Sequence, residues 1–267
     1  MTVACKATTN HTGRASPKMF SIYLHLIIGS LLMFIQPQFS IPSIRWMVLS
    51  LPTATLALLV GQMLPAQAQT RFSDVPSDYW AAPFIQVLAE RGVIRGFADG
   101  SFRPDDPITR AQFAVLVGQA FDRPPVRRAI RFRDVPTRYW AASAIQAAQR
   151  EGFLSGYPGG DFRPDQPMPR AQVSVALASG LQFTPDGTNI TVIGCFQDYS
   201  SIPQYAEDDV TAVTFRRMTL NYPNIRIFNP NRDSTRAEVA ASIYQGLVAT
   251  DNAPAIDSPY IYRLGQI

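Results

Sequence analysis

The chain has 267 residues and a formal net charge of +4, but its whole basic excess lies in residues 1–68. That segment contains Lys6, Arg14, Lys18 and Arg45 and no acid, which leaves 20 of the 24 Lys and Arg against all 20 Asp and Glu. The remaining chain is therefore neutral, and it lacks the basic balance typical of nucleic-acid binding. It also has no Lys or His, so every cation is Arg, whose planar fork suits carboxylates and phosphates.

Residues 1–68 are typical of an export leader. They contain two apolar stretches, roughly 19–36 and 46–64, and the second ends in a small-x-small pattern that favours cleavage after Ala68. We expect an exported protein of the periplasm, cell wall or outer envelope. The first stretch is explained by a start site placed too far upstream, or by an uncleaved transmembrane helix of marginal length. Only an uncleaved leader would tether the chain to a membrane. Cleavage would also remove Cys5, so we expect no intrachain disulfide in the mature chain.

A set of motifs occurs three times after the leader. The first two copies are 60 residues apart and share Phe-x-Asp-Val-Pro, Tyr-Trp-Ala-Ala, Phe-Arg-Pro-Asp and Arg-Ala-Gln, beginning at Phe72 and Phe132. A third copy, from Phe196, keeps the aspartate and a Thr-Arg-Ala-Glu motif but has lost its Trp and carries three acids at 207–209. The Phe of the Phe-Arg-Pro-Asp motif, which is Phe-Asn-Pro-Asn in the third copy, precedes the Arg of the last motif by eight residues in all three copies. A unit of this size predicts a repeat architecture.

Each repeat is predicted to form a helix, an ordered loop and a second helix. The first helix should begin near Ser77 or Asp78 and stop at Gly92, as the apolar spacing and the glycine indicate. Thr109 and Thr235 should cap the second helices of repeats one and three through capping boxes, whereas Pro169 offers no side-chain cap. A single helix pair buries little surface, so the three repeats should pack together. We predict repeats at 70–125, 126–184 and 185–249 and a tail at 250–267, and expect Asn221 to provide a left-handed backbone where the other repeats have glycine.

In order and spacing, these motifs resemble those of the S-layer homology (SLH) domain family. The resemblance covers about residues 70–249, is strong for two copies and moderate for the third, and departs from the family's Glu at Gln112 and Gln172. It implies an all-α fold of three helix–loop–helix repeats around a pseudo-threefold axis, with grooves between neighbours. It also implies a secreted, non-catalytic module that binds peptidoglycan-linked secondary cell-wall polysaccharide, often pyruvylated. An Arg-only mature chain also fits a GC-rich, cyanobacterial member.

The candidate ligand-binding residues are Arg110, Arg170 and Arg236, each expected at the first turn of a second helix. Free backbone N–H groups and the helix dipole favour an anion there, such as a pyruvyl carboxylate. Two interpretations stay open: the arginines contact the sugar carboxylate, or they form internal ion pairs with the motif aspartates, which are Asp74, Asp134 and Asp198. The groove that relies most on repeat three should be the weakest, because its acids repel an anionic ligand.

Other signals are weaker. Trp80 and Trp140 could stack on sugars, but their helical spacing with apolar neighbours favours the core. The acidic loop at 99–106 lacks a complete calcium-ligand pattern, so we expect no metal and no cofactor. Two other functions remain as alternatives: an envelope scaffold that binds proteins and has lost sugar binding, and, less favoured, a wall hydrolase.

Overall fold

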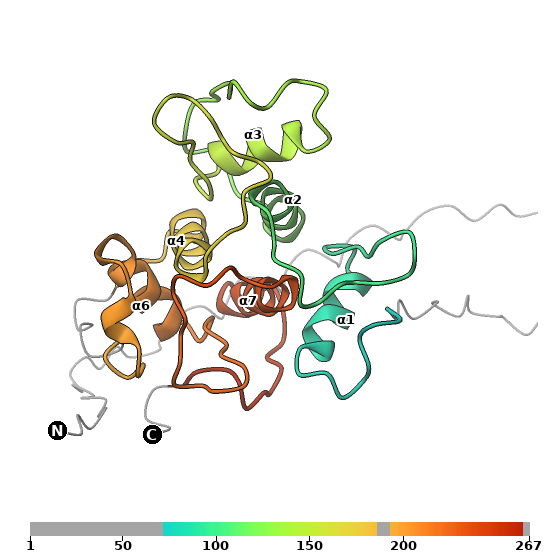
Figure 1. Cartoon of the computed structure of the whole chain (residues 1–267), viewed down its shortest axis with the longest axis vertical. Helices are drawn as coiled ribbons and strands as arrows, with labels where there is room; N and C mark the ends of the chain where they lie inside the picture. The colour runs from blue at the N-terminus through green and yellow to red at the C-terminus, as the bar shows by residue number, and fades with distance from the viewer. Residues whose placement is uncertain (1–71, 186–192, 264–267) are drawn as a thin grey trace, which may run out of the picture. The chain divides into compact units, whose positions relative to one another are not determined.

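The computed structural model describes residues 72–185 and 193–263, which belong to one compact unit. The predicted leader therefore lies outside the described residues. Within the described part the fold is all-α, as predicted, with isolated bridges in place of strands. The helices of Figure 1 are α1 (Ala82–Glu90), α2 (Arg110–Ala120), α3 (Ala142–Arg150), α4 (Arg170–Leu181), α6 (Glu207–Phe215) and α7 (Arg236–Ala249), with short 3₁₀ turns at Tyr199–Ser201 and Gln204–Ala206.

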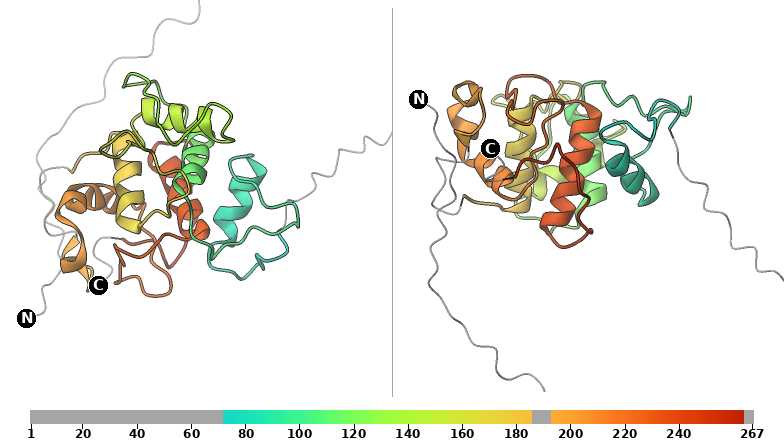
Figure 2. Two further views of the ribbon diagram at one scale, coloured as in Figure 1. Left: turned by 45° about the horizontal axis from the view of Figure 1, so that its top comes forward. Right: turned by 90° about the horizontal axis from the view of Figure 1, so that it is seen from below.

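Helices pair between repeats. The first helix of each repeat packs against the second helix of another repeat: α3 against α2, α6 against α4, and α1 against α7. The second helices α2, α4 and α7 lie together at the centre, with the first helices outside them (Figures 1 and 2). Each pair joins two different repeats, so no repeat can bury its own helices alone. The prediction that the three repeats pack together is confirmed.

Backbone contacts close this arrangement into a ring. Isolated bridges join Pro107 to Thr235, Thr109 to Pro167, and Pro169 to Asp233, so every repeat is linked to both others just before its second helix. Each second helix also donates backbone hydrogen bonds to another repeat's loop; the Ala111 N–H, for example, donates to the Pro164 carbonyl at 2.9 Å. A closed ring is what the expected pseudo-threefold arrangement requires, and the symmetry itself stays a prediction.

The core consists of the facing surfaces of these paired helices. Phe84, Leu88 and Phe113 are completely buried, and Ile145 and Ile243 are at most 1% exposed. A smaller cluster in repeat three includes Phe196, Val210, Phe228 and Tyr262. Phe102, Phe162 and Phe228, which lie eight residues before the three motif arginines, are at most 2% exposed. At about 25 cal/mol per Å² of apolar surface, their burial is a main source of stability.

An aspartate clamp shapes the loop of each repeat. The two carboxylate oxygens of Asp74 accept hydrogen bonds from the backbone N–H groups of Phe102 and Arg103, both at 2.7 Å. Asp134 and Asp198 make the equivalent pairs of bonds in repeats two and three. The second residue of each pair has a left-handed backbone, with φ of 58°, 59° and 54° at Arg103, Arg163 and Asn229 respectively. Charge-assisted bonds therefore offset a conformation that non-glycine residues rarely adopt.

The prediction of a left-handed backbone at Asn221 is wrong. Neither Asn221 nor the glycines it replaces has a positive φ. A Cβ on Gly96 would lie 2.5 Å from the Phe72 ring, and one on Gly156 would lie 2.4 Å from the Phe132 ring. These glycines therefore allow a close approach of the phenylalanine. Asn221 is 2% exposed and uses its side-chain amide for hydrogen bonds instead.

The helices begin and end where the sequence signals predict, except for the start of α1. Thr109 and Thr235 form complete capping boxes, and Pro169 makes no side-chain cap. Gly92 and Gly152 follow α1 and α3 with φ of 71° and 92°, as their stop role requires. The first helix begins at Ala82 rather than near Ser77 or Asp78. The reason is that residues 76–82 form successive turns before Pro83 enters the first helical turn.

The tail packs back onto repeat three. Ile261 pairs with Leu220, and the Tyr262 N–H donates to the Thr219 carbonyl at 2.9 Å. Ile261 and Tyr262 are both buried. The described part of the tail is therefore a strap that packs against repeat three.

Cys195 is disulfide-bonded in this structure, which is that of the uncleaved chain. The expected absence of a disulfide concerned the chain after loss of Cys5, and it stays a prediction for that form. Across residues 72–185 and 193–263, no helix combines the length and apolar character that a membrane span needs.

Candidate functional site

Three arginines connect the repeats. Arg110, Arg170 and Arg236 begin α2, α4 and α7, and each side chain reaches into another repeat. Their Nε atoms donate to the carbonyls of the motif phenylalanines at 2.8, 2.6 and 2.8 Å, in the order Phe162, Phe228 and Phe102. All three arginines are at most 9% exposed. Repeat one therefore contacts repeat two, repeat two contacts repeat three, and repeat three contacts repeat one.

The Nη2 atoms make a second contact with the same neighbouring loop. Arg110 donates to the Ser155 carbonyl at 2.6 Å, and Arg236 donates to the Arg95 carbonyl at 3.4 Å. Both of these bonds are only partly buried. Arg170 donates to the Leu220 carbonyl and the Asn221 side chain at 2.9 and 2.5 Å, and both bonds are buried. The three interfaces thus share a design but differ in how deeply the guanidinium is enclosed.

Aromatic rings complete each interface. The guanidinium carbon lies 4.5 Å from the Phe162 ring centre in Arg110 and 4.6 Å from the Phe102 ring centre in Arg236. A second ring faces each of these two arginines, Tyr157 at 4.9 Å and Phe97 at 5.0 Å. Cation–π attraction therefore helps to hold each guanidinium in place.

The expected ion pairs between arginines and motif aspartates do not form. No ion pair within 4.0 Å joins Asp74, Asp134 or Asp198 to an arginine in the part of the chain that the structure describes. The reason is that both oxygens of each aspartate are committed to backbone N–H groups of the loop. The arginines do connect one repeat to the next, as that interpretation proposed, but through carbonyl groups.

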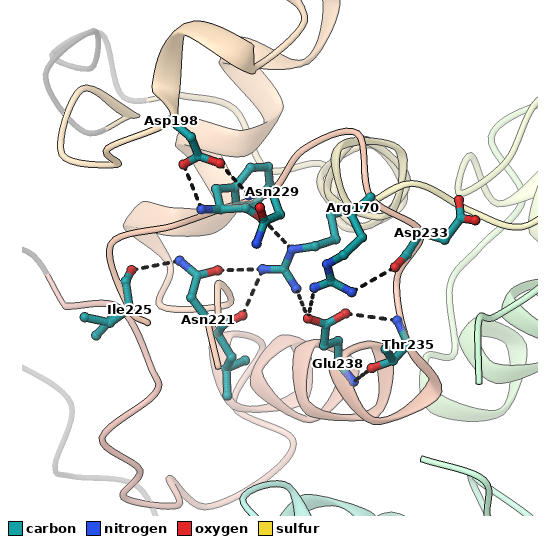
Figure 3. Close-up of polar contacts among 11 residues, drawn as sticks. Arg170, Asp198, Asn221, Ile225, Asn229, Asp233, Thr235 and Glu238 are labelled. Carbon is teal, nitrogen blue, oxygen red and sulfur yellow. Dashed lines mark hydrogen bonds and ion pairs between the residues drawn. The ribbon is translucent and has the colours of Figure 1, made fainter. Parts of the chain in front are cut away.

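One interface contains an internal carboxylate. Glu238 lies on α7 and is paired with Arg170 of α4, with Nη1 and Oε1 2.7 Å apart and both side chains at most 8% exposed (Figure 3). Arg232 also donates to Oε1 at 2.5 Å, and the Thr235 N–H donates to Oε2 at 2.9 Å. At the equivalent positions of the other repeats stand the neutral side chains of Gln112 and Gln172. The sequence showed this difference, but not that Glu238 contacts the arginine of another repeat.

Burial shifts the pKa values of these groups. Loss of solvation lowers the pKa of Arg110, Arg170 and Arg236 from its ordinary value. Burial alone would raise the pKa of Glu238, but the charge of Arg170 and the hydrogen bonds from Arg232 and Thr235 outweigh it and hold the pKa below its ordinary 4.5. The pair is therefore ionised at neutral pH.

The lowered pKa of Glu238 predicts a pH dependence of stability. Its stabilising effect is complete above the unfolded-state pKa of about 4.5 and is lost as the pH falls through the lower, folded-state value. We expect the difference in unfolding free energy between the wild type and Glu238→Gln to shrink on acidification below pH 4.5. Urea unfolding of both proteins at a series of pH values measures this difference. A Glu238→Gln difference that stays constant across this pH range would contradict the assignment.

The tryptophans are not equivalent, and the core interpretation is wrong for one of them. Trp140 is 63% exposed. Trp80 is half-buried because Tyr222 stacks on it at 5.4 Å with 7° between the ring planes, and Tyr260 contacts it edge-on at 6.1 Å. Sequence reasoning missed both tyrosines, although Tyr222 follows Asn221 just as Phe97 follows Gly96. Whether either Trp contacts a sugar stays a prediction.

Other candidate groups do not assemble into a reactive cluster. Within the described ranges no group of three or more His, Cys, Asp or Glu side chains could hold a metal ion. Glu207, Asp208 and Asp209 form the first turn of α6, the position where acids favour the helix dipole. The Asp99 carboxylate accepts hydrogen bonds from Ser101 and pairs with Arg103, so its contacts lie within its own turn.

Comparison with known proteins matches this chain to one family. The family described as the S-layer homology domain matches residues 71–114 and 131–174. An endoglucanase of Bacillus sp. (strain KSM-635) is 31% identical over 64% of this chain and 18% of its own length. A cellulosome-anchoring protein of Acetivibrio thermocellus is 34% identical over 40% of this chain and 24% of its own length. An S-layer protein of Bacillus licheniformis is 29% identical over 72% of this chain and 21% of its own length.

The match to these relatives is therefore a match to one part of each, since it spans no more than a quarter of their lengths. The two matched segments coincide with the first two repeats and include Arg110 and Arg170. Repeat three reproduces the same aspartate clamp, the same capping box and the same arginine-to-carbonyl bond. The first two repeats of this chain are S-layer homology domains, at residues 71–114 and 131–174.

Proposed function

We propose that this protein is an exported, non-catalytic module that anchors to the cell wall by binding an anionic polysaccharide in its inter-repeat grooves. The ligand class is a peptidoglycan-linked secondary wall polysaccharide that carries carboxylates, with ketal-linked pyruvate as the best candidate. The observation that carries the proposal is the presence of two buried arginines at repeat interfaces, Arg110 and Arg236, whose hydrogen-bond partners are neutral carbonyl groups.

Burial of a cation without a direct ion pair is costly, and this argues for an anionic ligand. Asp134 attracts Arg110, and Asp106 attracts Arg236, but neither aspartate forms an ion pair within 4.0 Å. Arg110 and Arg236 have two hydrogen bonds each, both to carbonyl oxygens, and form no ion pair with a described residue. Their Nη1 atoms make no hydrogen bond in the described part of the chain. A carboxylate bound there would supply both the missing charge and the missing acceptor.

Exposed aromatic side chains supply the second feature that sugar binding needs. Trp140 and Tyr205, which occupy equivalent positions in repeats two and three, are each 63% exposed. Trp and Tyr rings are enriched at binding surfaces because each combines an apolar face with a polar group. A pyranose ring can stack on such a face while its carboxylate pairs with an arginine. This placement supports a role in sugar contact for Trp140.

The relatives support the cellular setting. Their names describe an S-layer protein, a cellulosome-anchoring protein and an enzyme, which share this segment but differ elsewhere. A segment shared by proteins of such different kinds is better explained by a common location than by a common reaction. We therefore place the protein at the cell surface or in the wall, with no reaction of its own.

Sedimentation with purified walls tests the proposal. The full chain should co-sediment with native walls and largely remain in solution with walls whose pyruvyl ketals have been removed by mild acid. Peptidoglycan stripped of its polysaccharide serves as the control and should retain little protein. Equal retention on native and depyruvylated walls would exclude pyruvate as the recognised group, and retention on neither would favour the envelope-scaffold alternative.

A further inference from the structure

We infer that the interface between repeats one and two, at Arg110, recognises a second anionic group of the polysaccharide beside the pyruvyl carboxylate. Arg163 and Arg127 bind this second group, next to the ring of Tyr157. The inference rests on the proposed function and specifies the ligand of one interface as a sugar segment with two negative charges. It makes Arg163 and Arg127 specificity-determining residues.

Two guanidinium groups lie at one tyrosine ring in this interface. The guanidinium carbons of Arg110 and Arg163 lie 4.9 and 4.2 Å from the centre of the Tyr157 ring. Arg110 is 5% exposed, whereas Arg163 is exposed to solvent. Besides the loss of solvation, the charge of Arg163 lowers the pKa of Arg110. Two like charges this close repel one another, and bound anions would relieve the repulsion.

Arg127 brings a third guanidinium to the same place. Its Nη1 donates to the Ser155 hydroxyl at 2.8 Å, and Nη2 of Arg110 donates to the Ser155 carbonyl at 2.6 Å. The two arginines thus bond two oxygens of one residue. Arg127 is exposed, and it belongs to the segment 122–133, which contains five Arg and one Asp. Repeat two therefore presents an excess of positive charge at this interface.

These three arginines have no paired carboxylate. Within the described ranges no acidic side chain forms an ion pair within 4.0 Å with Arg110, Arg127 or Arg163. Asp134 attracts Arg110, but its two oxygens accept hydrogen bonds from backbone N–H groups. Ligand anions can therefore bind here without displacing an internal partner.

The equivalent turn of repeat one supplies its own carboxylate. Arg103 stands where repeat two has Arg163, and it is paired with Asp99 at 2.9 Å. Gly159 replaces that aspartate in repeat two, and a Cβ on it would lie 3.2 Å from Nη2 of Arg133. A cation therefore lies beside the position where repeat one has an anion.

The second cation also distinguishes the three interfaces. At Arg236 it is Arg103, which faces Phe97 at 3.8 Å and is already paired with an aspartate. At Arg170 the corresponding residue is the neutral Asn229. The Arg110 interface thus combines two arginines that have no paired carboxylate with a tyrosine ring, whose hydroxyl Phe97 lacks. We expect the preference for a doubly charged ligand at this interface.

Sugars with one and two charges test the inference. The probes are a methyl hexoside with a 4,6-pyruvyl ketal, the same hexoside extended by glucuronic acid, and the same hexoside extended by neutral glucose. Titration of the full chain, followed by NMR of the Nε–H signals of Arg110 and Arg163, gives affinities at this interface. The glucuronic acid disaccharide should bind about tenfold more tightly than the glucose disaccharide, the lower end for a hydrogen bond to a charged group. The Arg163 signal should shift only with the glucuronic acid disaccharide.

Arg163→Asn removes the second cation and keeps the local backbone. Asn229 occupies the equivalent position of repeat three with φ of 54°, against 59° at Arg163, and its N–H makes the same bond to the motif aspartate. The variant should lose the tenfold preference and keep its affinity for the singly charged hexoside, whereas a structural defect would weaken both. Arg127→Gln should reduce the preference about threefold. The matched control Arg103→Asn should leave it unchanged.

The outcomes separate the inference from the function on which it rests. Equal affinities of the wild type for the two disaccharides, or a preference that survives both Arg163→Asn and Arg127→Gln, would overturn the inference and leave the proposed function standing. No binding of any of the three sugars would overturn the proposed function and the inference with it. If Arg163→Asn does not fold, the wild-type comparison and Arg127→Gln decide.

Discussion

Replacement of Arg170 by methionine is expected to lower the free energy of unfolding by about 3–5 kcal/mol, the usual cost of breaking a buried ion pair. Arg170 links α4 to the loop of repeat three and is the buried counter-ion of Glu238. Without it, Glu238 retains a single, 43%-exposed cationic partner, Arg232, and three protein acceptors lose their donor. Urea unfolding followed by circular dichroism measures the change.

Arg232→Met is the matched control, since it removes the other cation that contacts Glu238. Arg232 lies at the surface, so its loss should cost at most about 1 kcal/mol. The double variant Arg170→Met with Glu238→Met should recover most of the stability lost by Arg170→Met, because no buried charge is then left without a partner. Equal effects of Arg170→Met and Arg232→Met would contradict the assigned role of Arg170.

Gly180→Ala is expected to destabilise the protein by about 2–3 kcal/mol, although alanine is the better helix former. A Cβ at Gly180 in α4 would lie 2.0 Å from the ring of Phe153, which is 2% exposed and stacked on Phe121. The ring cannot move aside without disturbing the contact between α2 and α3. Thermal and urea unfolding both report the effect.

Gly118→Ala in α2, another second helix, is expected to have the opposite effect and to stabilise the protein. Gly118 is an exposed residue of α2, and a Cβ there would have no heavy atom within 4 Å. The substitution should stabilise the protein by about 0.5–1 kcal/mol, the difference in helix propensity. If both variants shift stability in the same direction, the packing of Phe153 against Gly180 is not as described.

Local structure was largely readable from the sequence. Threonine followed three residues later by Gln or Glu indicated the starts of α2 and α7, and Gly92 and Gly152 indicated the ends of α1 and α3. These signals succeed because capping and left-handed turns depend on residues a few positions apart. The start of α1 was misplaced because turns and a helix share the same apolar spacing there.

Contacts between repeats could not be read in the same way. The sequence showed that Glu238 differs from Gln112 and Gln172, but its partner Arg170 lies in another repeat and 68 positions earlier. The exposure of Trp140 was missed for a similar reason. Its burial depends on whether another repeat supplies a covering ring, and only Trp80 receives one from Tyr222. Contacts between repeats therefore decide which of three similar motifs has its aromatic ring covered.

The most direct test of the account is arginine side-chain NMR of the wild-type protein during titration with the pyruvylated hexoside. The Nε–H signals of Arg110, Arg170 and Arg236 can be assigned from single Arg→Lys variants. We predict saturable shifts for Arg110 and Arg236, whose hydrogen-bond partners are neutral carbonyl groups. Saturable binding that leaves Arg110 and Arg236 unshifted would contradict the account.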